Sequence, residues 1–279
     1  MTSSLKPARR GFLQAFSGLT AGLASLTSLQ AAAKTGAQAS TNTAKRPVGA
    51  KYMGDFVAPK LSKVKVAIIG VGARGSGHAA QLAAIEGVQF VGICDLVEAR
   101  AKKSAAVVGK SGHTPKVYFG DENGWRTMLA ETKPDAVFIN TPWSSHAPMA
   151  IASMHAGAHA FVEVPIATTL QEMWDIVDAS EATGRHCMMM ENVNYGREEL
   201  LYLNMVRQGV LGDLLHGEAS YIHALRFQME NGDSTGSWRT FEYAKRNGNL
   251  YPTHGLGPVA QYMNLARGED NFGRITSFS

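Results

Sequence analysis

Hydrophobic residues in the middle of the chain form short continuous runs separated by stretches of helical periodicity. Such runs predict buried strands over residues 64–69, 88–94, 116–119, 136–141, 160–162 and 187–191. The intervening segments predict helices over 76–86, 98–108, 124–131, 149–156 and 170–183. Continuous apolar strands that alternate with helices indicate a parallel sheet with both faces covered. We therefore predict an α/β fold with a Rossmann doubly wound parallel sheet in residues 61–192.

The pattern changes after residue 192. Helices are expected over 198–208 and 255–267, strands over 214–223 and from 274 to 279, and residues 232–249 are polar and aperiodic. Two strands would leave their edges and one apolar face uncovered. Residues 193–279 are therefore expected to be an incomplete α+β domain with an open, mainly antiparallel sheet, truncated before its end.

The first residues have the pattern of an export signal. Arg9 and Arg10 precede a mildly apolar run over 16–29, and three alanines follow. We interpret residues 1–33 as a twin-arginine (Tat) signal peptide and 34–60 as a linker. The prediction is export by the Tat machinery and a periplasmic or secreted localisation. The alternative is an Ala- and Ser-rich tail that contains an arginine pair by chance.

Charge and cysteines narrow the possible partners. The chain has 27 Lys and Arg against 23 Asp and Glu, but seven of the basic residues precede Asp55, the first acidic residue. The remaining body is slightly acidic, which indicates neither nucleic acid nor an anionic membrane as a partner. Cys94 and Cys187 lie in or beside apolar runs and are expected to be buried thiols. No Cys/His cluster has zinc spacing, so no metal site is predicted.

A glycine-rich loop directly follows the first predicted strand. Its G-x-G-x-x-G spacing provides a tight turn, close approach of the backbone to a pyrophosphate, and a helix N-terminus that favours anions. Asp95 ends the second strand, where a carboxylate accepts from ribose hydroxyls and repels a 2′-phosphate. A loop that serves only as a turn is the alternative. The pattern predicts NAD rather than NADP, bound by Gly70, Gly72, Ala73, Arg74, Gly75 and Asp95.

Further cofactor contacts are expected at the carboxyl ends of the later strands, where open α/β sheets bind ligands. Trp143 and His146 follow the fourth strand, Glu163 and Val164 the fifth, and Asn192 the sixth. Trp143 offers a flat apolar surface and His146 a hydrogen-bond donor. A histidine that merely starts a helix is the alternative for His146.

From the glycine-rich loop onward, the sequence resembles the Gfo/Idh/MocA oxidoreductase family. That family carries a Glu-Lys-Pro motif after the fifth strand, and its lysine serves the dehydrogenation of a sugar alcohol. This chain has Glu163-Val164-Pro165 instead. Valine carries neither a proton nor a charge, so the acid–base function of the lysine must belong to another residue.

Three further segments resemble one branch of that family, glycoside hydrolase family 109. They are 191–195 (Glu-Asn-Val-Asn-Tyr), 221–223 (Tyr-Ile-His) and 251–258 (Tyr-Pro-Thr-His-Gly-Leu-Gly-Pro). The resemblance implies an NAD-dependent α-N-acetylgalactosaminidase. It also implies that the chain lacks a C-terminal part that members of this family have.

The chemistry that the resemblance implies is hydrolysis by elimination. Oxidation of the sugar at C3 gives a ketone that acidifies the C2 proton; a base removes this proton and the C1 substituent leaves. Water then adds and the ketone is reduced again, with retained configuration and no NAD consumed. This cycle suits an exported protein, because free nicotinamide cofactor is cytoplasmic. No pair of carboxylates is needed, unlike in most glycosidases.

Several residues are candidates for this chemistry. His254 is the expected acid–base group because imidazole titrates near neutral pH. Tyr251, Tyr195 and Glu163 are the other catalytic candidates, and Glu163 could instead orient the nicotinamide ribose. The resemblance implies substrate or cofactor contacts for Tyr221 and Arg239. The other expected substrate contacts are Tyr251, Thr253 and His254. The alternatives are a core-packing pair for Tyr251 and His254 and a solvated side chain for Arg239, while His223 is expected to be structural.

Two other functions remain open. An exported NAD-dependent sugar oxidoreductase of the same family could oxidise one sugar and reduce another. A catalytically inactive NAD-binding protein is the third possibility. The expected substrate is a carbohydrate that ends in N-acetylgalactosamine or a related glycoside, and a homo-oligomer is an open alternative to a monomer.

Overall fold

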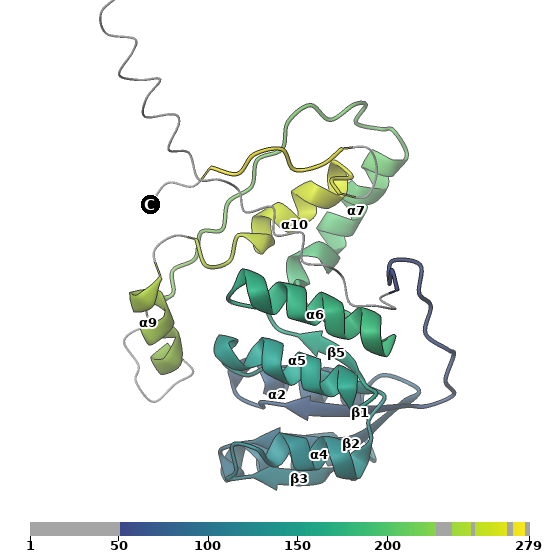
Figure 1. The fold of residues 1–279 in the computed structure, drawn as a ribbon, viewed down its shortest axis with the longest axis vertical. Coiled ribbons are helices and arrows are strands. Elements are labelled where there is room, and N and C mark those ends of the chain that lie inside the picture. The colour runs from purple at the N-terminus through teal and green to yellow at the C-terminus, as the bar shows by residue number, and fades with distance from the viewer. Residues whose placement is uncertain (1–50, 227–235, 247–248, 267–269, 277–279) are drawn as a thin grey trace, which may run out of the picture. The chain divides into compact units, whose positions relative to one another are not determined.

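The computed structural model describes residues 51–226, 236–246, 249–266 and 270–276. The predicted signal peptide and most of the linker lie outside the described residues. Six strands form one parallel sheet, in the order β3-β2-β1-β4-β5-β6 (Figure 1). They coincide with the predicted apolar runs within two residues: β1 Val64–Ile69, β2 Val88–Asp95, β3 Lys116–Phe119, β4 Ala136–Ile139, β5 His159–Val162 and β6 Cys187–Met189.

The strand order creates a switch point beside β1. The sheet grows from β1 toward β2 and β3 in one direction and toward β4, β5 and β6 in the other. In such sheets the ligand binds outside the carboxyl ends of the strands at this point. The loops that follow β1 and β4 are therefore the expected floor of a binding site.

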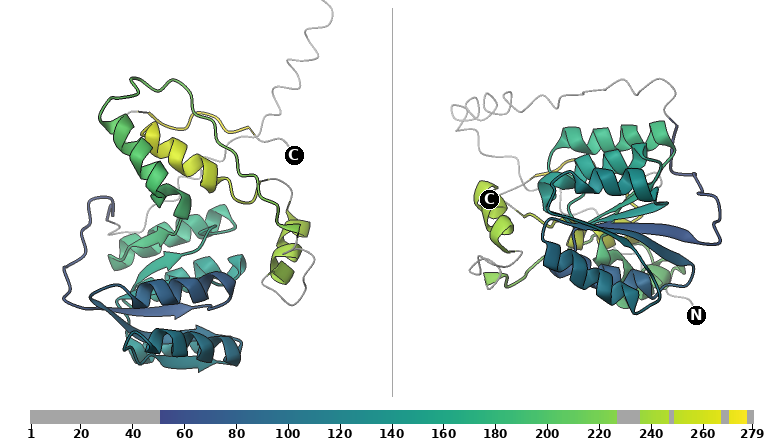
Figure 2. Two further views of the ribbon diagram at one scale, coloured as in Figure 1. Left: turned by 180° about the vertical axis from the view of Figure 1, so that it is seen from behind. Right: turned by 90° about the horizontal axis from the view of Figure 1, so that it is seen from below.

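Helices cover both faces of the sheet, as the right-hand view of Figure 2 shows. Two apolar cores divide the helices between the faces. The first core is covered by α4 (Gly124–Thr132), α5 (His146–His155) and α6 (Leu170–Thr183), and the second by α2 (Ala73–Ala83) and α3 (Glu98–Gly109).

Alternate residues of a strand belong to opposite cores, which explains the continuous apolar runs. In β1, Ala67 and Ile69 pack into the first core, and Val66 and Ile68 into the second. A strand buried on both faces has no polar positions to alternate with. Complete burial of a side chain such as Ile68 contributes about 1.5–3 kcal/mol to folding.

Two helices begin three residues earlier than predicted. The helix α2 begins at Ala73 rather than at 76, directly after the glycine-rich loop. The helix α5 begins at His146 rather than at 149, because Pro148 is tolerated in the first turn, where its missing N–H has no intrahelical acceptor. By contrast, α6 has the predicted bounds, which a capping box between Thr169 and Glu172 fixes.

The C-terminal segment, residues 193–279, contains helices but no strand among its described residues. The helix α7 (Arg197–Arg207) and the helix α10 (Thr253–Tyr262) pack against each other. Residues 214–223 and 270–276 have no secondary structure, so the strand predicted over 214–223 is wrong for this structure. A strand needs a partner for its backbone groups, and none of the described segments pairs with these residues. The end of the other predicted strand, 277–279, lies outside the described residues.

A helix that the sequence did not predict lies within the segment interpreted as aperiodic. It is α9, Gly236–Lys245. Glu242 forms ion pairs with Lys245 and, at 3.0 Å, with Arg246, contacts that helical spacing permits. Trp238 packs edge-on against Trp143 from a distant part of the chain, so tertiary contacts stabilise this helix.

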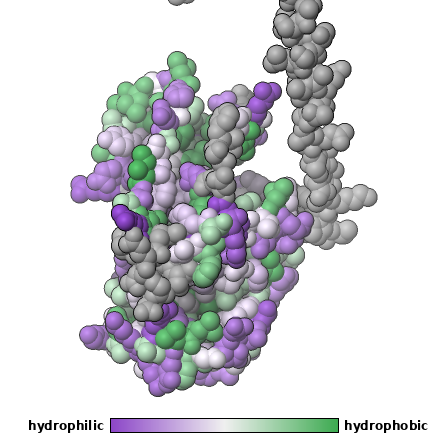
Figure 3. Space-filling model, turned by 90° about the vertical axis from the view of Figure 1, so that its left-hand side faces the viewer, coloured by the Kyte–Doolittle hydropathy of each residue, from purple (hydrophilic) through white to green (hydrophobic). Residues whose placement is uncertain are grey.

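The C-terminal segment leaves apolar side chains on the surface. Figure 3 shows green, apolar atoms over the upper part of the molecule, which this segment forms. The exposed apolar side chains of this segment include Leu201, Val210, Leu215 and Ile222. None of the described helices is long and apolar enough to cross a membrane.

Candidate active site

The glycine-rich loop has the geometry that its spacing predicts. Gly70 has φ of +84°, and a Cβ there would lie 2.7 Å from the carbonyl oxygen of Asn140. A Cβ on Gly75 would overlap the carbonyl oxygen of Gly70. The first turn of α2 has neither a side-chain cap nor an acidic residue, so its N–H groups are open to an anion.

Asp95 holds the loop in place from the end of β2. Its Oδ2 accepts a hydrogen bond from the N–H of Val71 at 2.8 Å, and its Oδ1 accepts one from the N–H of Val97 at 2.8 Å. Each carboxylate oxygen can accept a second hydrogen bond. The predicted ribose acceptor is therefore fixed beside the loop and retains lone pairs for hydroxyl groups.

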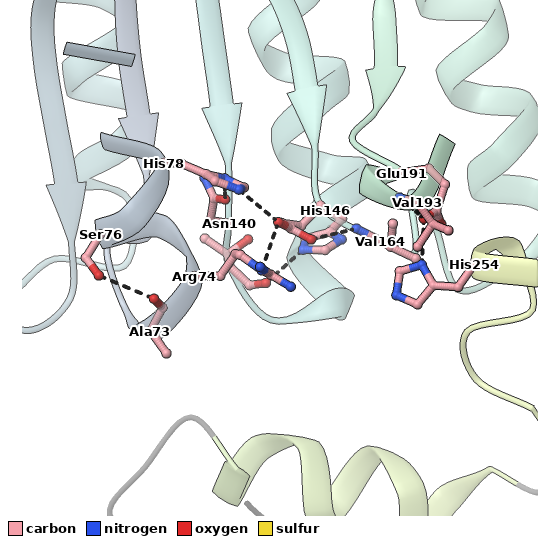
Figure 4. A network of polar contacts seen from close by, with 12 residues as sticks. Ala73, Arg74, Ser76, His78, Asn140, His146, Val164, Glu191, Val193 and His254 are labelled. Atoms are coloured by element: carbon pink, nitrogen blue, oxygen red, sulfur yellow. Dashed lines mark hydrogen bonds and ion pairs between the residues drawn. The ribbon is translucent and has the colours of Figure 1, made fainter. Parts of the chain in front are cut away.

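Polar side chains from three elements meet beside the loop (Figure 4). Glu163 follows β5, and its Oε1 lies 3.7 Å from Nε of Arg74 and 3.6 Å from Nε2 of His78. The other ring nitrogen of His78 lies 2.6 Å from Oδ1 of Asn140. Both Arg74 and His78 belong to α2, so Glu163 links the start of this helix to the carboxyl end of β5.

These residues fit a dinucleotide. The loop has no side chain where a pyrophosphate would approach, and the start of α2 is uncapped. The buried Nδ2 of Asn140 has no hydrogen-bond partner in the described structure, and buried donors of this kind are normally satisfied. A polar ligand at the strand ends would satisfy it. Gly70, Gly72, Ala73, Arg74, Gly75 and Asp95 line this region and would hold the pyrophosphate and ribose.

His146 lies beneath the site and is fully buried. Its Nδ1 lies 2.7 Å from the carbonyl oxygen of Pro165, and its Nε2 lies 2.7 Å from that of Thr141. Burial lowers the pKa of His146, although both carbonyls oppose the shift. The ring joins the loops that follow β4 and β5, which favours a role in holding these loops rather than the predicted role of cofactor donor.

Val164 belongs to an aromatic cluster. Val164, Trp143 and Tyr251 form its buried centre, and Trp238 and Tyr243 of α9 pack against it. The ring of Trp143 stands edge-on to Trp238 at 5.3 Å and to Tyr251 at 5.5 Å. At the position of the family's lysine, this chain therefore has an apolar side chain in apolar surroundings. A lysine there would have to bury its charge.

Tyr251 connects this cluster to His254. The two rings stack at 5.3 Å with an interplanar angle of 13°. Burial raises the pKa of Tyr251 to about 12, although the nearby Arg239 guanidinium opposes the shift. That guanidinium lies over the ring of Tyr251, 5.4 Å from its centre. Tyr251 is therefore a neutral phenol that can donate a hydrogen bond near neutral pH.

A short contact joins His254 to Glu191. Nδ1 of His254, in α10, lies 2.6 Å from Oε1 of Glu191, which follows β6. Glu191 is 1% exposed, and the same oxygen accepts the N–H of Val193 at 3.1 Å. Figure 4 shows the second ring nitrogen of His254 pointing away from Glu191. This contact anchors the C-terminal segment to the edge of the Rossmann sheet.

Unsatisfied polar atoms gather near this contact. Four buried oxygens in segments 191–194 and 251–253 have no hydrogen-bond partner in the described structure: Oε2 of Glu191, Oδ1 of Asn194, Oη of Tyr251 and Oγ1 of Thr253. Native proteins rarely leave such atoms without partners. A concentration of them where two segments meet is typical of a site that binds a polar ligand.

The other predicted residues lie in the same region. Asn192 begins η3 (Asn192–Tyr195), and Tyr195, which ends it, is 55% exposed. The ring of Tyr221 lies 5.0 Å from that of His254, and its hydroxyl lies 3.1 Å from Nδ1 of His223. His223, which was expected to be structural, is exposed, and its contact with Tyr221 places it close to the candidate site.

Sequence reasoning missed three residues of this region. Glu191 belongs to the motif 191–195 but had no predicted role, although an acid directly after an apolar strand is a local signal. His78 lies on α2 one turn after the loop, and nothing local indicates its contact with Asn140. Trp238 was missed because its helix was not predicted.

Two families match consecutive parts of the chain. Residues 64–191 match the oxidoreductase family with the NAD-binding Rossmann fold, and residues 195–279 match the C-terminal domain of glycosyl hydrolase 109. Over residues 64–191 the chain thus resembles the Gfo/Idh/MocA type of NAD-binding proteins. Within that type it resembles glycoside hydrolase family 109, as its sequence motifs predicted.

Curated relatives agree with this assignment. A glycosyl hydrolase family 109 protein 1 from Akkermansia muciniphila is 61% identical over 236 residues, which are 84% of this chain and 49% of the relative. A glycosyl hydrolase family 109 protein from Shewanella sp. (strain W3-18-1) is 52% identical over 97% of this chain and 58% of the relative. The chain spans about half the length of the curated relatives it matches.

Solved structures share the fold. A scyllo-inositol dehydrogenase from Lactobacillus casei, with bound NAD(H) and scyllo-inositol, superposes with a TM-score of 0.58 at 21% identity, covering 72% of this chain and 56% of that one. A myo-inositol 2-dehydrogenase from Lactobacillus plantarum gives 0.59 at 21% identity, covering 72% of this chain and 57% of that one. At this identity the likeness concerns the fold alone.

Proposed function

We propose that the protein is an NAD-dependent glycosidase that hydrolyses α-N-acetylgalactosaminides or close relatives. The proposal concerns the whole protein, of which this chain matches about half by comparison with its relatives. The observation that carries it is Val164, which is 4% exposed within the aromatic cluster. An ordinary dehydrogenase of this family would have a lysine at this position, so the usual proton transfer needs another group.

His254 is that group in our proposal. When bound, NAD supplies the oxidising power for C3 of the sugar and the hydride that restores it. His254 takes the C2 proton of the resulting ketone, and the C–H electron pair forms the C1–C2 double bond as the glycosidic C1–O bond breaks. Water then gives its hydroxyl to C1 and its other proton to the departing oxygen, and a proton returns to C2. The C3 hydroxyl proton is released to solvent during the oxidation and returns when the ketone is reduced. Tyr251 donates a hydrogen bond to a sugar oxygen, while Tyr195, Tyr221, Arg239 and Thr253 form the rest of the sugar site.

On the cofactor side, we assign Glu163 to orienting the nicotinamide ribose. Its contacts with Arg74 and His78 hold it at the start of α2. Asn192, Trp143 and Val164 line the nicotinamide end. NAD stays bound between turnovers in this proposal, because the reaction restores it at each cycle.

The decisive experiment follows p-nitrophenol release from the α-N-acetylgalactosaminide without added reductant. Substrate deuterated at C2 should exchange its label with solvent, and a 3-deoxy substrate should not react. His254→Ala should reduce hydrolysis about 10²-fold or more, the usual scale for loss of an acid–base group, while bound NAD stays. Retained C2 deuterium together with normal hydrolysis of the 3-deoxy sugar would exclude the elimination mechanism.

The alternative proposal is a sugar oxidoreductase of the same family. The parallel NAD-binding sheet, whose fold the inositol dehydrogenases share, favours it. It predicts accumulation of NADH with free sugars and no release of p-nitrophenol. The two outcomes exclude each other.

We also propose that the protein is exported in folded form with its cofactor. Arg9 and Arg10 with the following apolar run support this proposal. Replacing both arginines by lysine should leave the uncleaved precursor in the cytoplasm. If cell fractionation finds the double variant processed and in the periplasm, the proposal is contradicted.

A further inference from the structure

A buried carboxylate lies directly behind the proposed acid–base histidine. Glu191 and His254 are 63 residues apart in the chain, and the 2.6 Å contact between them involves one carboxylate oxygen. The histidine side chain is 17% exposed and the glutamate side chain 2% exposed. The pair therefore has one member at the edge of the candidate site and one inside the protein.

We propose that Glu191 is a positioning residue that holds His254 in the tautomer with its proton on Nδ1. A carboxylate only accepts hydrogen bonds, so the short contact requires an N–H at Nδ1. A neutral imidazole carries one N–H, which leaves the lone pair on Nε2. The proposal rests on the role of His254 in the proposed function, because this lone pair is what accepts the C2 proton.

The carboxylate also stabilises the product of that proton transfer. Once Nε2 has accepted a proton, the imidazolium carries a positive charge next to the buried Glu191. A histidine oriented by a buried carboxylate in this way is the arrangement of serine hydrolases. Since Val164 cannot accept or donate a proton, the pair supplies the acid–base function in its place.

The competing explanation is purely structural. Glu191 precedes η3 and accepts the N–H of Val193, so it also acts as a helix cap. A cap needs only an acceptor oxygen, which glutamine provides as well. Stabilising the imidazolium also requires the negative charge of a carboxylate, which glutamine lacks.

Glu191→Gln separates the two explanations. With its amide oxygen in the place of Oε1, the variant still accepts from Val193 and from Nδ1–H, but it lacks the negative charge beside the ring. We therefore expect the ¹⁵N ring shifts of His254 to keep the Nδ1–H tautomer. We expect kcat to fall about 10²-fold or more with little change in KM, because the imidazolium loses the carboxylate that stabilises it.

A double-mutant cycle with His254→Ala tests whether Glu191 acts through the histidine. In the His254→Ala background, Glu191→Gln should lower the rate no further, because the group it orients is gone. A structural role would lower the rate in both backgrounds. The matched control is Glu172→Gln, which changes another capping glutamate on α6 and should alter neither the rate nor the tautomer of His254.

The ¹⁵N spectrum decides the proposal even if the protein does not hydrolyse the galactosaminide. A wild-type His254 with its proton on Nε2 would overturn it without any variant. So would a Glu191→Gln variant that keeps both the Nδ1–H tautomer and the wild-type rate. If Glu191→Gln does not fold, Glu191→Asp retains an acceptor-only group, and we expect it to keep the Nδ1–H tautomer.

Discussion

Two glycines of α2 offer a matched test of the cofactor loop. A Cβ on Gly75 would overlap the carbonyl oxygen of Gly70 and come within 3.1 Å of Cβ of Asn140. A backbone oxygen cannot rotate away, so the loop must shift, and overpacking of this kind costs about 1–3 kcal/mol. A Cβ on Gly77 meets nothing within 4 Å, and alanine stabilises a helix interior by about 0.5–1 kcal/mol over glycine.

Gly75→Ala should therefore lower the free energy of unfolding, whereas Gly77→Ala should raise it. The displaced loop also contacts the pyrophosphate less well, and a loss of about 1.4 kcal/mol there weakens NAD binding tenfold. Urea unfolding and titration calorimetry with NAD measure the two effects. Equal stability and equal NAD affinity in both variants would refute the view that contact between Gly75 and Gly70 shapes the loop.

Two further predictions concern the cofactor acid and the buried histidines. Asp95→Ala should weaken NAD binding and reduce discrimination against NADP, because it removes both the ribose acceptor and a repulsive charge; an unchanged affinity ratio in calorimetry would contradict this assignment. Burial lowers the pKa values of His146 and His159. In the unfolded chain these histidines have the ordinary pKa of about 6.5, so as the pH falls they bind protons there before they do in the folded protein. The free energy of unfolding should therefore fall as the pH is lowered from 7.5 to 5.5. Urea titrations that find constant or rising stability toward pH 5.5 would exclude this explanation.

The Rossmann sheet could be predicted because its signal is local. Residues such as Ile68 and Ile93 are buried on a sheet covered on both faces, so their strands have apolar runs that are visible without knowledge of the partner. The strand predicted over 214–223 lacks such a partner among the described residues. The helix α9 was missed because Trp238 gains its main contact from Trp143, almost a hundred residues earlier.

The candidate site was predictable only in part, for the same reason. The spacing of Gly70, Gly72 and Gly75 is a local pattern, and the following helix α2 adds the context that makes it specific. The contact of Glu191 with His254 depends on how the C-terminal segment folds back onto the sheet. No spacing in the sequence encodes that approach.

The ring of His146 has a consequence for the two loops that it touches. It touches two carbonyl oxygens, those of Thr141 and Pro165, each at 2.7 Å. With its pKa lowered by burial, the neutral ring has a single N–H to share between them. Only one of the two carbonyls can accept this N–H at a time, so the position of one proton determines which of the two loops is hydrogen-bonded to the ring.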